Sequence, residues 1–324
     1  MNDNHQSYQP KTNLGMAIDP IHVGTGATGL GRVDNAIVRD PVTRVPKIPG
    51  SSLAGVSRTY AAMAKGRFPN CAGLGQTGRG GSIGHCGKPS CPICVVFGFA
   101  RGNAGGFAGL AAFSDAHVLL FPVASREGPV WITCPMAIRA LKHEIDGVKD
   151  NAVYRAGSSQ HLNLGWILLP VKSFDALDNI GNLMPILQNH NLPDYVRERF
   201  AVVSDKLFSH VVNTNLEVRT SVAIDPQTGA AEEGALFTYE ALPRTTVLTW
   251  DVTCRNPSHF KVGAETVTAV TTPTDVYEIV ATAHPYLEHL GIGGMSTRGM
   301  GRLRVLGASS TGAESAGTTA KGAS

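Results

Sequence analysis

The stretch VDNAIVRDPVTRVPKIPGSSLAGVSR, residues 33–58, predicts the first strand-to-helix passage of the fold. NAIVRD is strand-like, and the Pro-rich VPKIPG after it is typical of a turn. Ser51 or Ser52 is the expected N-cap of the helix, and Gly66 its expected end. Apolar residues recur between them at helical spacing, at Leu53, Val56, Tyr60 and Met63.

Two basic side chains and two hydroxyls accompany this helix start, at Lys47, Ser51, Ser52 and Arg58. The N-terminus of a helix attracts anions through its free N–H groups and its dipole, and such side chains would assist. A helix that is simply capped by serine is the common alternative, and the stretch taken alone favours it.

Asp34 lies between a glycine-rich loop and a strand that ends at Arg39. A carboxylate beside a phosphodiester can help to deprotonate the attacking hydroxyl, directly or through a divalent ion. A surface ion pair with Arg32 or Arg39 is the simpler interpretation of a single aspartate. Asp34 is therefore a candidate catalytic residue with an ordinary alternative.

Outside this stretch, strand and helix patterns alternate irregularly. Alternating β-branched residues on both sides of the Asp225-Pro-Gln-Thr-Gly229 turn predict a long hairpin within residues 215–254. Hairpin-linked strands favour an α+β architecture over a doubly wound parallel sheet. The other expected elements are strands within 109–123 and 166–174, a strand-to-helix passage at 128–141, and helices near 180–190, 202–212 and 272–290.

Two glycine-rich loops differ in what they predict. Residues 22–26 follow a strand but open no helix, so they match neither a dinucleotide nor a Walker loop. Residues 291–302 combine many backbone N–H donors with Gly293, Gly294, Arg298 and Arg302, which suits the backbone of a nucleic acid. A flexible connector between helix and strand is the alternative for this second loop.

Four of the six cysteines, Cys71, Cys86, Cys91 and Cys94, lie within a glycine-rich segment at about 69–109. A Cys-x2-Cys pair with two further thiolates predicts a tetrahedral Zn²⁺ site, because a loop so poor in hydrophobic residues cannot stabilise itself by burial. His85 is adjacent as a possible substitute ligand. A redox Cys-x2-Cys is the competing interpretation, but the surrounding βαβ pattern is missing.

The composition of the chain limits the classes of protein that it can belong to. The chain has 324 residues, 43% of them hydrophobic, and a net charge of +3, so RNA binding would depend on local clusters of Lys and Arg. No apolar run approaches the length of a membrane span and the start lacks a signal-peptide pattern, so we expect a cytoplasmic protein without membrane partners. Residues 308–324 are of low complexity and are expected to be a disordered tail.

These features together resemble the RAMP-superfamily backbone subunit of type III-B (Cmr) CRISPR effector complexes, from about residue 14 to 307. The motifs that carry the resemblance occur in the family's order: HVGTG, Asp34, PKIPGSSLAGVSR, VVSDKLFSHVVNTNLEVRT, EEGALFTYEALP and GIGGMSTRGMGRLRV. The resemblance implies one backbone domain at 1–307, a modified ferredoxin-like (RRM-like) palm. Its insertions would be the Cys-rich segment at about 69–109 and a thumb-like β-hairpin at about 217–245.

The resemblance also implies partners: a CRISPR guide RNA, a target RNA, other subunits of the complex, and copies of this chain in a filament. Asp34 would cleave guide-paired target RNA at periodic sites with a divalent cation such as Mg²⁺ or Mn²⁺, the 2′-hydroxyl attacking to give a 2′,3′-cyclic phosphate. The guide would be held by the two basic segments, at Lys47, Ser51, Ser52, Arg58, Gly293, Gly294, Arg298 and Arg302.

Two departures from the family pattern stand out. Members commonly carry a proline two residues after the aspartate, where this chain has Asn35-Ala36, and the cysteine cluster is better known from related type III subunits, which suggests a zinc-containing variant. The same scaffold without cutting activity is the main alternative function. A zinc-stabilised metabolic enzyme that binds a nucleotide is a third.

Overall fold

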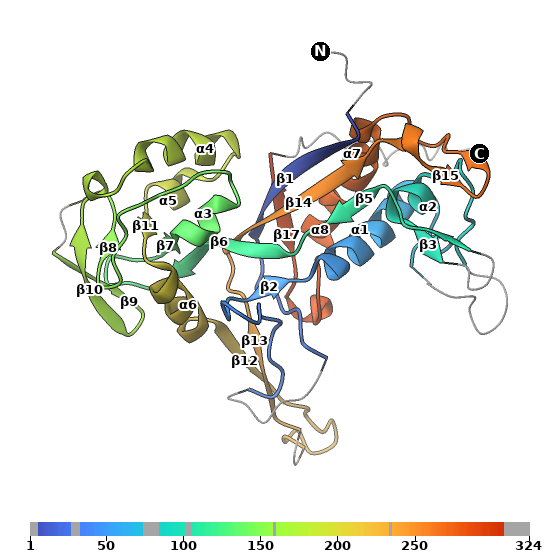
Figure 1. Ribbon diagram of the computed structural model, residues 1–324. Coiled ribbons are helices and arrows are strands. Elements are labelled where there is room, and N and C mark those ends of the chain that lie inside the picture. Colours follow the sequence, from blue (N-terminus) through green and yellow to red (C-terminus); the bar gives the residue numbers. More distant parts are fainter. Residues whose placement is uncertain are drawn as a thin grey trace, which may run out of the picture.

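The antiparallel pair formed by β1 (Tyr8–Ala17) and β14 (Val247–Arg255) has the longest pairing in the main sheet. Figure 1 shows the pair in the computed structural model, which describes residues 6–26, 33–73, 84–100, 105–157, 160–232 and 235–307. Their register runs without interruption from Tyr8 opposite Arg255 to Met16 opposite Val247. The predicted tail at 308–324 lies outside the described residues.

The connections around this pair form a β-α-β-β-α-β fold. Helix α1 (Gly50–Ala64) lies between β1 and β6 (Ala116–Val123) in sequence, and β14 pairs between those two strands. Helices α7 (Pro273–Ala281) and α8 (His284–His289) lead from β14 to β17 (Leu303–Leu306), which pairs with the other edge of β1. This is the ferredoxin-like topology, and it confirms the predicted α+β palm.

Helix α1 begins at Gly50, and its N-cap residue is Pro49. The expected capping by Ser51 or Ser52 is wrong, because no side chain of the helix start makes a capping hydrogen bond. Instead, the Asp115 carboxylate accepts a 2.7 Å hydrogen bond from the Gly50 N–H. Only glycine fits there, since a Cβ at residue 50 would lie 2.7 Å from the Phe113 carbonyl oxygen.

A second lobe continues the same sheet beyond β6 (Figure 1). The passage expected at 128–141 is a strand followed by a short helix. The helix expected near 202–212 is present, and Ser204 caps it by accepting from the Leu207 N–H. The strands of the lobe are β7 (Val130–Thr133), β8 (Val153–Tyr154), β9 (His161–Leu164), β10 (Ile167–Lys172) and β11 (Phe200–Val202). Its helices are α3 (Pro135–Arg139), α4 (Leu183–Asn189), α5 (Asp194–Arg197) and α6 (Asp205–Thr214).

The predicted hairpin is present but shorter than its sequence pattern indicates. β12 (Glu217–Ser221) and β13 (Phe237–Ala241) pair antiparallel and project from the palm (Figure 1). The Asp225-to-Gly229 turn forms as expected, with the Gly229 N–H donating to the Asp225 carbonyl at 2.8 Å. Residues 247–254 are not part of the hairpin, because they pair with β1 in the main sheet.

The Cys-rich segment has more regular structure than its sequence predicts. It contains helix α2 (Pro92–Phe97) and the two-stranded pair β3 (Phe99–Ala100) and β4 (Gly106–Phe107). The remaining short strands are β2 (Lys47–Ile48), β5 (Ala111–Phe113), β15 (Lys261–Val262) and β16 (Glu265–Thr266).

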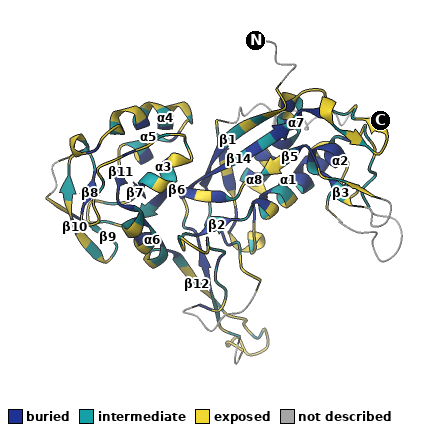
Figure 2. Ribbon diagram, viewed as in Figure 1, coloured by how far each residue is buried: buried dark blue, intermediate teal, exposed yellow. Residues whose placement is uncertain are grey.

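The buried apolar residues form two large cores, and Figure 2 shows the buried stretches in dark blue. One core packs α1 and α7 against the sheet through residues such as Leu53 and Val276. The other core fills the second lobe, with Leu119 and Trp131 among its members. β6 contributes to both cores, which is why six of its eight residues are buried. Among the described residues, every helix is too short or too polar to span a membrane.

Candidate RNA interface and metal centre

Asp34 is exposed at the root of the hairpin, and its carboxylate is fixed by β13. Its Oδ2 accepts hydrogen bonds from the Thr238 N–H at 2.8 Å and from the Thr238 hydroxyl at 2.9 Å. These bonds, the backbone one first, lower the pKa of Asp34, so the group is a carboxylate at neutral pH. The other oxygen, Oδ1, accepts no hydrogen bond from another described residue.

Arg39 does not pair with Asp34. Its guanidinium bonds to the buried Glu240 carboxylate at 2.8 Å and to the Asn213 side chain at 2.8 Å. It therefore ties the loop that carries Asp34 to β13 and to α6. Of the two ion pairs considered for Asp34, the one with Arg39 is ruled out, and Arg32 lies outside the described residues.

The first glycine loop holds the hairpin root against the second glycine loop. The buried His22 ring bonds through Nδ1 to the Glu240 carbonyl at 2.6 Å, and the His22 carbonyl accepts from the Gly294 N–H at 2.8 Å. A carbonyl oxygen can only accept, so Nδ1 carries a proton. The sequence shows His22 only as part of a glycine motif, because its role depends on partners more than 200 residues away.

The second glycine loop presents an exposed backbone, as the sequence predicts. Gly293 and Gly294 are exposed, and Gly293 has φ +90°, which favours glycine. A Cβ at residue 293 would lie 2.3 Å from the His22 carbonyl oxygen. Arg298 ends the short 3-10 turn Ser296–Arg298 and is exposed. Arg302 is exposed but forms an ion pair with Asp19.

A basic cluster around Asp19 has no recognisable signal in the sequence. Three guanidiniums, from Arg302, Arg244 and Arg219, lower the pKa of Asp19, the Arg302 hydrogen bond most strongly. The backbone geometry explains this convergence, because the Thr245 N–H donates to the Ala17 carbonyl at 2.7 Å beside the root of the hairpin. In the sequence Arg244 follows a proline in a loop, with no signal that it would meet residues near position 19.

The start of α1 is partly neutralised by protein groups. The Lys47 ammonium lies 2.6 Å from an Asp115 carboxylate oxygen, and the same carboxylate receives the Gly50 N–H. Lys47 and Gly50 together lower the pKa of Asp115. Ser51 is exposed and Ser52 half-buried, so their hydroxyls border this surface.

Tyr60 joins α1 to the second glycine loop. Its hydroxyl donates to the Gly291 carbonyl at 2.7 Å, and its ring stacks on Tyr286 of α8 at a centroid distance of 5.7 Å. The two segments predicted to bind the guide therefore belong to one packed unit.

The placement of Arg58 does not support its predicted contact with RNA. The residue is 8% exposed and its guanidinium turns inward, toward the Cys-rich segment. It donates to the Cys71 carbonyl at 2.7 Å and to the Gly98 carbonyl at 2.6 Å. Helical periodicity explains the error, because Arg58 lies on the same side of α1 as Ala61 and Ala62, which pack on the cysteines.

The four predicted metal ligands converge. The Sγ atoms of Cys71, Cys86, Cys91 and Cys94 all lie within 4.8 Å of one another, with Cys86 and Cys94 3.7 Å apart and Cys71 and Cys91 3.9 Å apart. Four sulfurs around one zinc at Zn–S bonds of about 2.3 Å would be spaced by about 3.8 Å. The residues therefore fit a tetrahedral metal ion. Three of them are buried, and Cys86 is half-buried.

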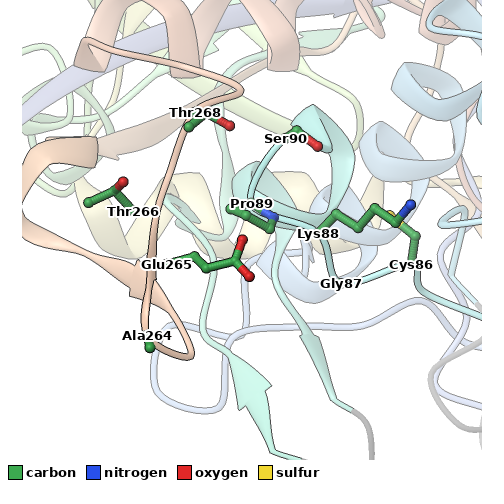
Figure 3. Close-up of a pocket in the computed structure, with 9 residues that line it drawn as sticks. All are labelled: Cys86, Gly87, Lys88, Pro89, Ser90, Ala264, Glu265, Thr266 and Thr268. Carbon is green, nitrogen blue, oxygen red and sulfur yellow. The ribbon is translucent and has the colours of Figure 1, made fainter.

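A shallow pocket of about 810 Å³ opens beside this cluster (Figure 3). It lies between the loop at residues 86–90 and the β15–β16 turn, from which Glu265 extends toward Pro89. Cys86 is the only one of the four cysteines among its lining residues. The pocket contains none of the predicted RNA-binding residues, so it is separate from the surface around Asp34 and the second glycine loop.

The chain belongs to the RAMP superfamily, whose family model matches residues 16–304. Among curated proteins it is 25% identical to the CRISPR system Cmr endoribonuclease Cmr4 of Pyrococcus furiosus, over 71% of this chain and 76% of that protein. It is 40% identical to the endoribonuclease Csm3 of Methanothermobacter thermautotrophicus, over 26% of this chain and 30% of that protein.

Solved structures support the same fold. A chain of the type III-B Cmr-beta complex bound to cognate target RNA matches with a TM-score of 0.63 at 15% identity, covering 93% of this chain and 98% of that chain. Oligomeric Cmr4 from Pyrococcus furiosus matches with a TM-score of 0.58 at 16% identity, covering 92% and 98%.

Proposed function

We propose that the chain is a guide-RNA-binding backbone subunit of a type III CRISPR effector complex and that it cleaves target RNA paired with the guide. Membership of the RAMP superfamily and the similarity to Cmr4 support the class of protein. The observation that carries the cleavage is the ionised, exposed carboxylate of Asp34, fixed at the root of a projecting hairpin.

The guide would lie along the unit that contains the start of α1 and the second glycine loop. Gly293 and Gly294 are exposed and have no side chains, so a phosphate can approach this backbone closely, and Arg298 adds a charge. The Gly294 N–H is already bonded to the His22 carbonyl, so it is not counted as a donor to RNA. We add Arg244 to this surface, because it is exposed beside Asp19 and Arg302. We remove Arg58, because its guanidinium is bonded inside the protein.

The hairpin suits contact with the bases of the guide–target duplex. Several of its apolar side chains are exposed, and such patches mark interaction sites on otherwise soluble proteins: Val218, Val222, Ile224 and Leu236. Since Thr238 of the hairpin also holds Asp34, a nucleotide displaced by the hairpin would leave its phosphate close to that carboxylate.

In the reaction, the 2′-hydroxyl oxygen attacks the neighbouring phosphorus while its proton is removed. The bond from phosphorus to the 5′-oxygen breaks, and that oxygen takes up a proton, which leaves a 2′,3′-cyclic phosphate and a 5′-hydroxyl. Asp34 would orient the 2′-hydroxyl through its Oδ1. Because its pKa is lowered, it acts as a carboxylate and not as the acid that protonates the leaving group.

At this site, Asp34 is the described carboxylate that could bind a divalent cation. Mg²⁺ is commonly bound by one or two carboxylates together with substrate phosphates, so a single free carboxylate oxygen suffices when RNA is present. When bound there, the cation would offset the charge that develops on the phosphate oxygens. Glu240 would not contribute, because Arg39 already neutralises it.

The first test compares Asp34→Asn with the wild type in the assembled complex with guide. Asparagine keeps an oxygen that accepts from Thr238, so the loop should stay in place while the charge is lost. We expect cleavage at every periodic site to slow by about 10² or more, with unchanged guide binding. Asp150→Asn, an exposed aspartate of the second lobe, is the matched control and should cut normally.

Equal cutting by Asp34→Asn and wild type would instead favour the second candidate, a guide-binding scaffold without catalytic activity. The departure at Asn35-Ala36 keeps this candidate open. Asn35 itself is firmly held, since its N–H donates to the Thr238 carbonyl at 3.0 Å and its carbonyl accepts from the Glu240 N–H at 3.0 Å. These bonds support an ordered loop in the absence of the family's proline.

We also propose that the metal of the four-cysteine cluster is zinc and that it is structural. All four positions of a tetrahedral ion would be occupied by thiolates, so none is open for a substrate. The cluster packs on Ala61 and Ala62 of α1, which places its contribution in the stability of the palm.

A further inference from the structure

Arg58 is a buried cation that has no carboxylate partner among the described residues. Its three bonded nitrogens donate to the Cys71 carbonyl at 2.7 Å, to the Gly98 carbonyl at 2.6 Å and to His85 Nδ1 at 2.8 Å. The eight ion pairs found in the described part of the chain do not include Arg58. Because a guanidinium stays protonated in proteins, this charge requires compensation by neighbouring groups.

The cysteine cluster can supply this compensation, because its thiols become thiolates when they bind a metal. Burial lowers the pKa of Arg58, and negative charge on Cys94, Cys71 and Cys91 acts in the opposite direction and favours the protonated form. A zinc ion with four thiolates carries a net charge of about −2, which is itself costly to bury. A buried guanidinium beside a four-thiolate centre therefore lowers the free-energy cost of burying either charge.

The same hydrogen bonds decide the ligand set. A guanidinium nitrogen can only donate, so His85 Nδ1 must accept from Arg58, and that nitrogen is not directed at a metal. The four sulfurs are already close enough to enclose one ion. His85 does not belong to the group of converging ligand atoms, and it supports Arg58 through Nδ1.

We propose that Arg58 is the counter-ion of a four-thiolate metal centre, and that through Arg58 the metal fixes helix α1. Ser51 lies seven residues before Arg58 on the same helix, a distance of about 10 Å along its axis. This second part rests on the proposed function, since Ser51 and Ser52 belong to the proposed guide surface. Loss of the metal would loosen the helix at Arg58 and weaken the grip on RNA at its start.

The experiment uses the purified full-length chain without RNA, with Zn²⁺ and Co²⁺ as probes. Wild type should contain one zinc per chain. Arg58→Met, which removes the charge, should lower metal affinity in chelator competition by about tenfold or more, the usual effect of losing a group that supports metal ligands. Arg58→Lys keeps the charge, so its metal affinity should lie between those of wild type and Arg58→Met. Arg67→Met, an exposed arginine just beyond α1, is the control and should match wild type.

Equal affinities for Arg58→Met and wild type would overturn the proposal, as would equal weakening by Arg58→Lys and Arg58→Met. If Arg58→Met fails to fold, two other measurements test the proposal. The metal affinity of Arg58→Lys is compared with that of wild type, and the Co²⁺ absorption spectrum of His85→Ala tests the ligand set. His85→Ala should keep the spectrum of four thiolates, and a changed ligand set would contradict the assignment.

The coupling to RNA has its own readout. In wild type, removal of the metal by a chelator should weaken guide binding, and added Zn²⁺ should restore it. The metal affinities are measured without RNA, so they stand even if the chain binds no guide. Unchanged guide binding by the metal-free chain would overturn only the coupling.

Discussion

At the scale of single residues, partners brought by the fold decide what each charged group does. No sequence pattern gives Asp115 a role, yet its carboxylate accepts a hydrogen bond from the Gly50 N–H at the start of α1 and forms an ion pair with Lys47. Arg58 carried a predicted role in RNA binding and is instead buried beside the cysteines. A charge in a sequence indicates only that a partner is needed, whereas tertiary contacts determine which partner it finds.

Asp115→Ala should destabilise the protein by about 1–2 kcal/mol, the usual cost of losing a helix cap. The substitution leaves the Gly50 N–H without its acceptor and Lys47 without its counter-charge. Urea unfolding of both proteins at pH 7 checks this, with the exposed Asp150→Ala as control. An Asp115→Ala variant as stable as the control would show that water replaces the carboxylate at no cost.

At the scale of elements, two helix starts are fixed by residues that are close together in the sequence. Ser204 caps α6, and Thr272 with Asp275 forms a capping box at the start of α7. Hydrogen bonds of this kind connect residues three or four positions apart, so the sequence contains both partners. The start of α1 was misjudged because its acceptor is supplied by Asp115, 65 residues further along the chain.

Asp275 predicts a dependence of stability on pH. Hydrogen bonds from the Thr271 hydroxyl and backbone lower its pKa to about 2, from the ordinary 3.8. The folded-state pKa is the lower one, so the stabilisation is present above about pH 4 and is lost as the pH falls toward 2. Asp275→Asn should therefore be less stable than wild type at pH 6, and the difference should shrink between pH 4 and pH 2.5.

Urea unfolding across this pH range provides the measurement, with Glu278→Gln on the exposed side of the same helix as control. The control should differ little from wild type at every pH. A stability difference for Asp275→Asn that stays constant down to pH 2.5 would contradict the assignment of the low pKa to Asp275.

At the scale of the whole molecule, two insertions extend a small ferredoxin-like sheet by a second lobe and a projecting hairpin. The second lobe and the hairpin both enter between β6 and β14, two strands that pair with each other in the palm. β6 and β14 therefore pair directly in the palm, while the inserted hairpin projects from it (Figure 1). This arrangement separates the stability of the fold from the contacts that the hairpin makes.

Replacing residues 223–235 with Asn-Gly tests that separation. A two-residue turn suits β12 and β13, and the described residues of the removed segment are all at least partly exposed. We expect nearly unchanged thermal unfolding, retained guide binding, and target cleavage slower by about 10²-fold, because the scissile phosphate is no longer positioned. Cleavage at the wild-type rate would show that the hairpin tip does not position the target.

The sequence by itself determined the α+β class, the long amphipathic helix after Pro49, the Asp225–Gly229 turn and the grouping of the four cysteines. Each of these depends on periodicity, turn chemistry or the spacing of a few neighbouring residues. Only the tertiary structure decided that Asp34 is held by Thr238, that Arg244 joins Arg302 around Asp19, and that Arg58 faces the cysteines. These contacts join residues separated by up to 283 positions, and no local pattern encodes which distant group will fill a given place in a packed sheet.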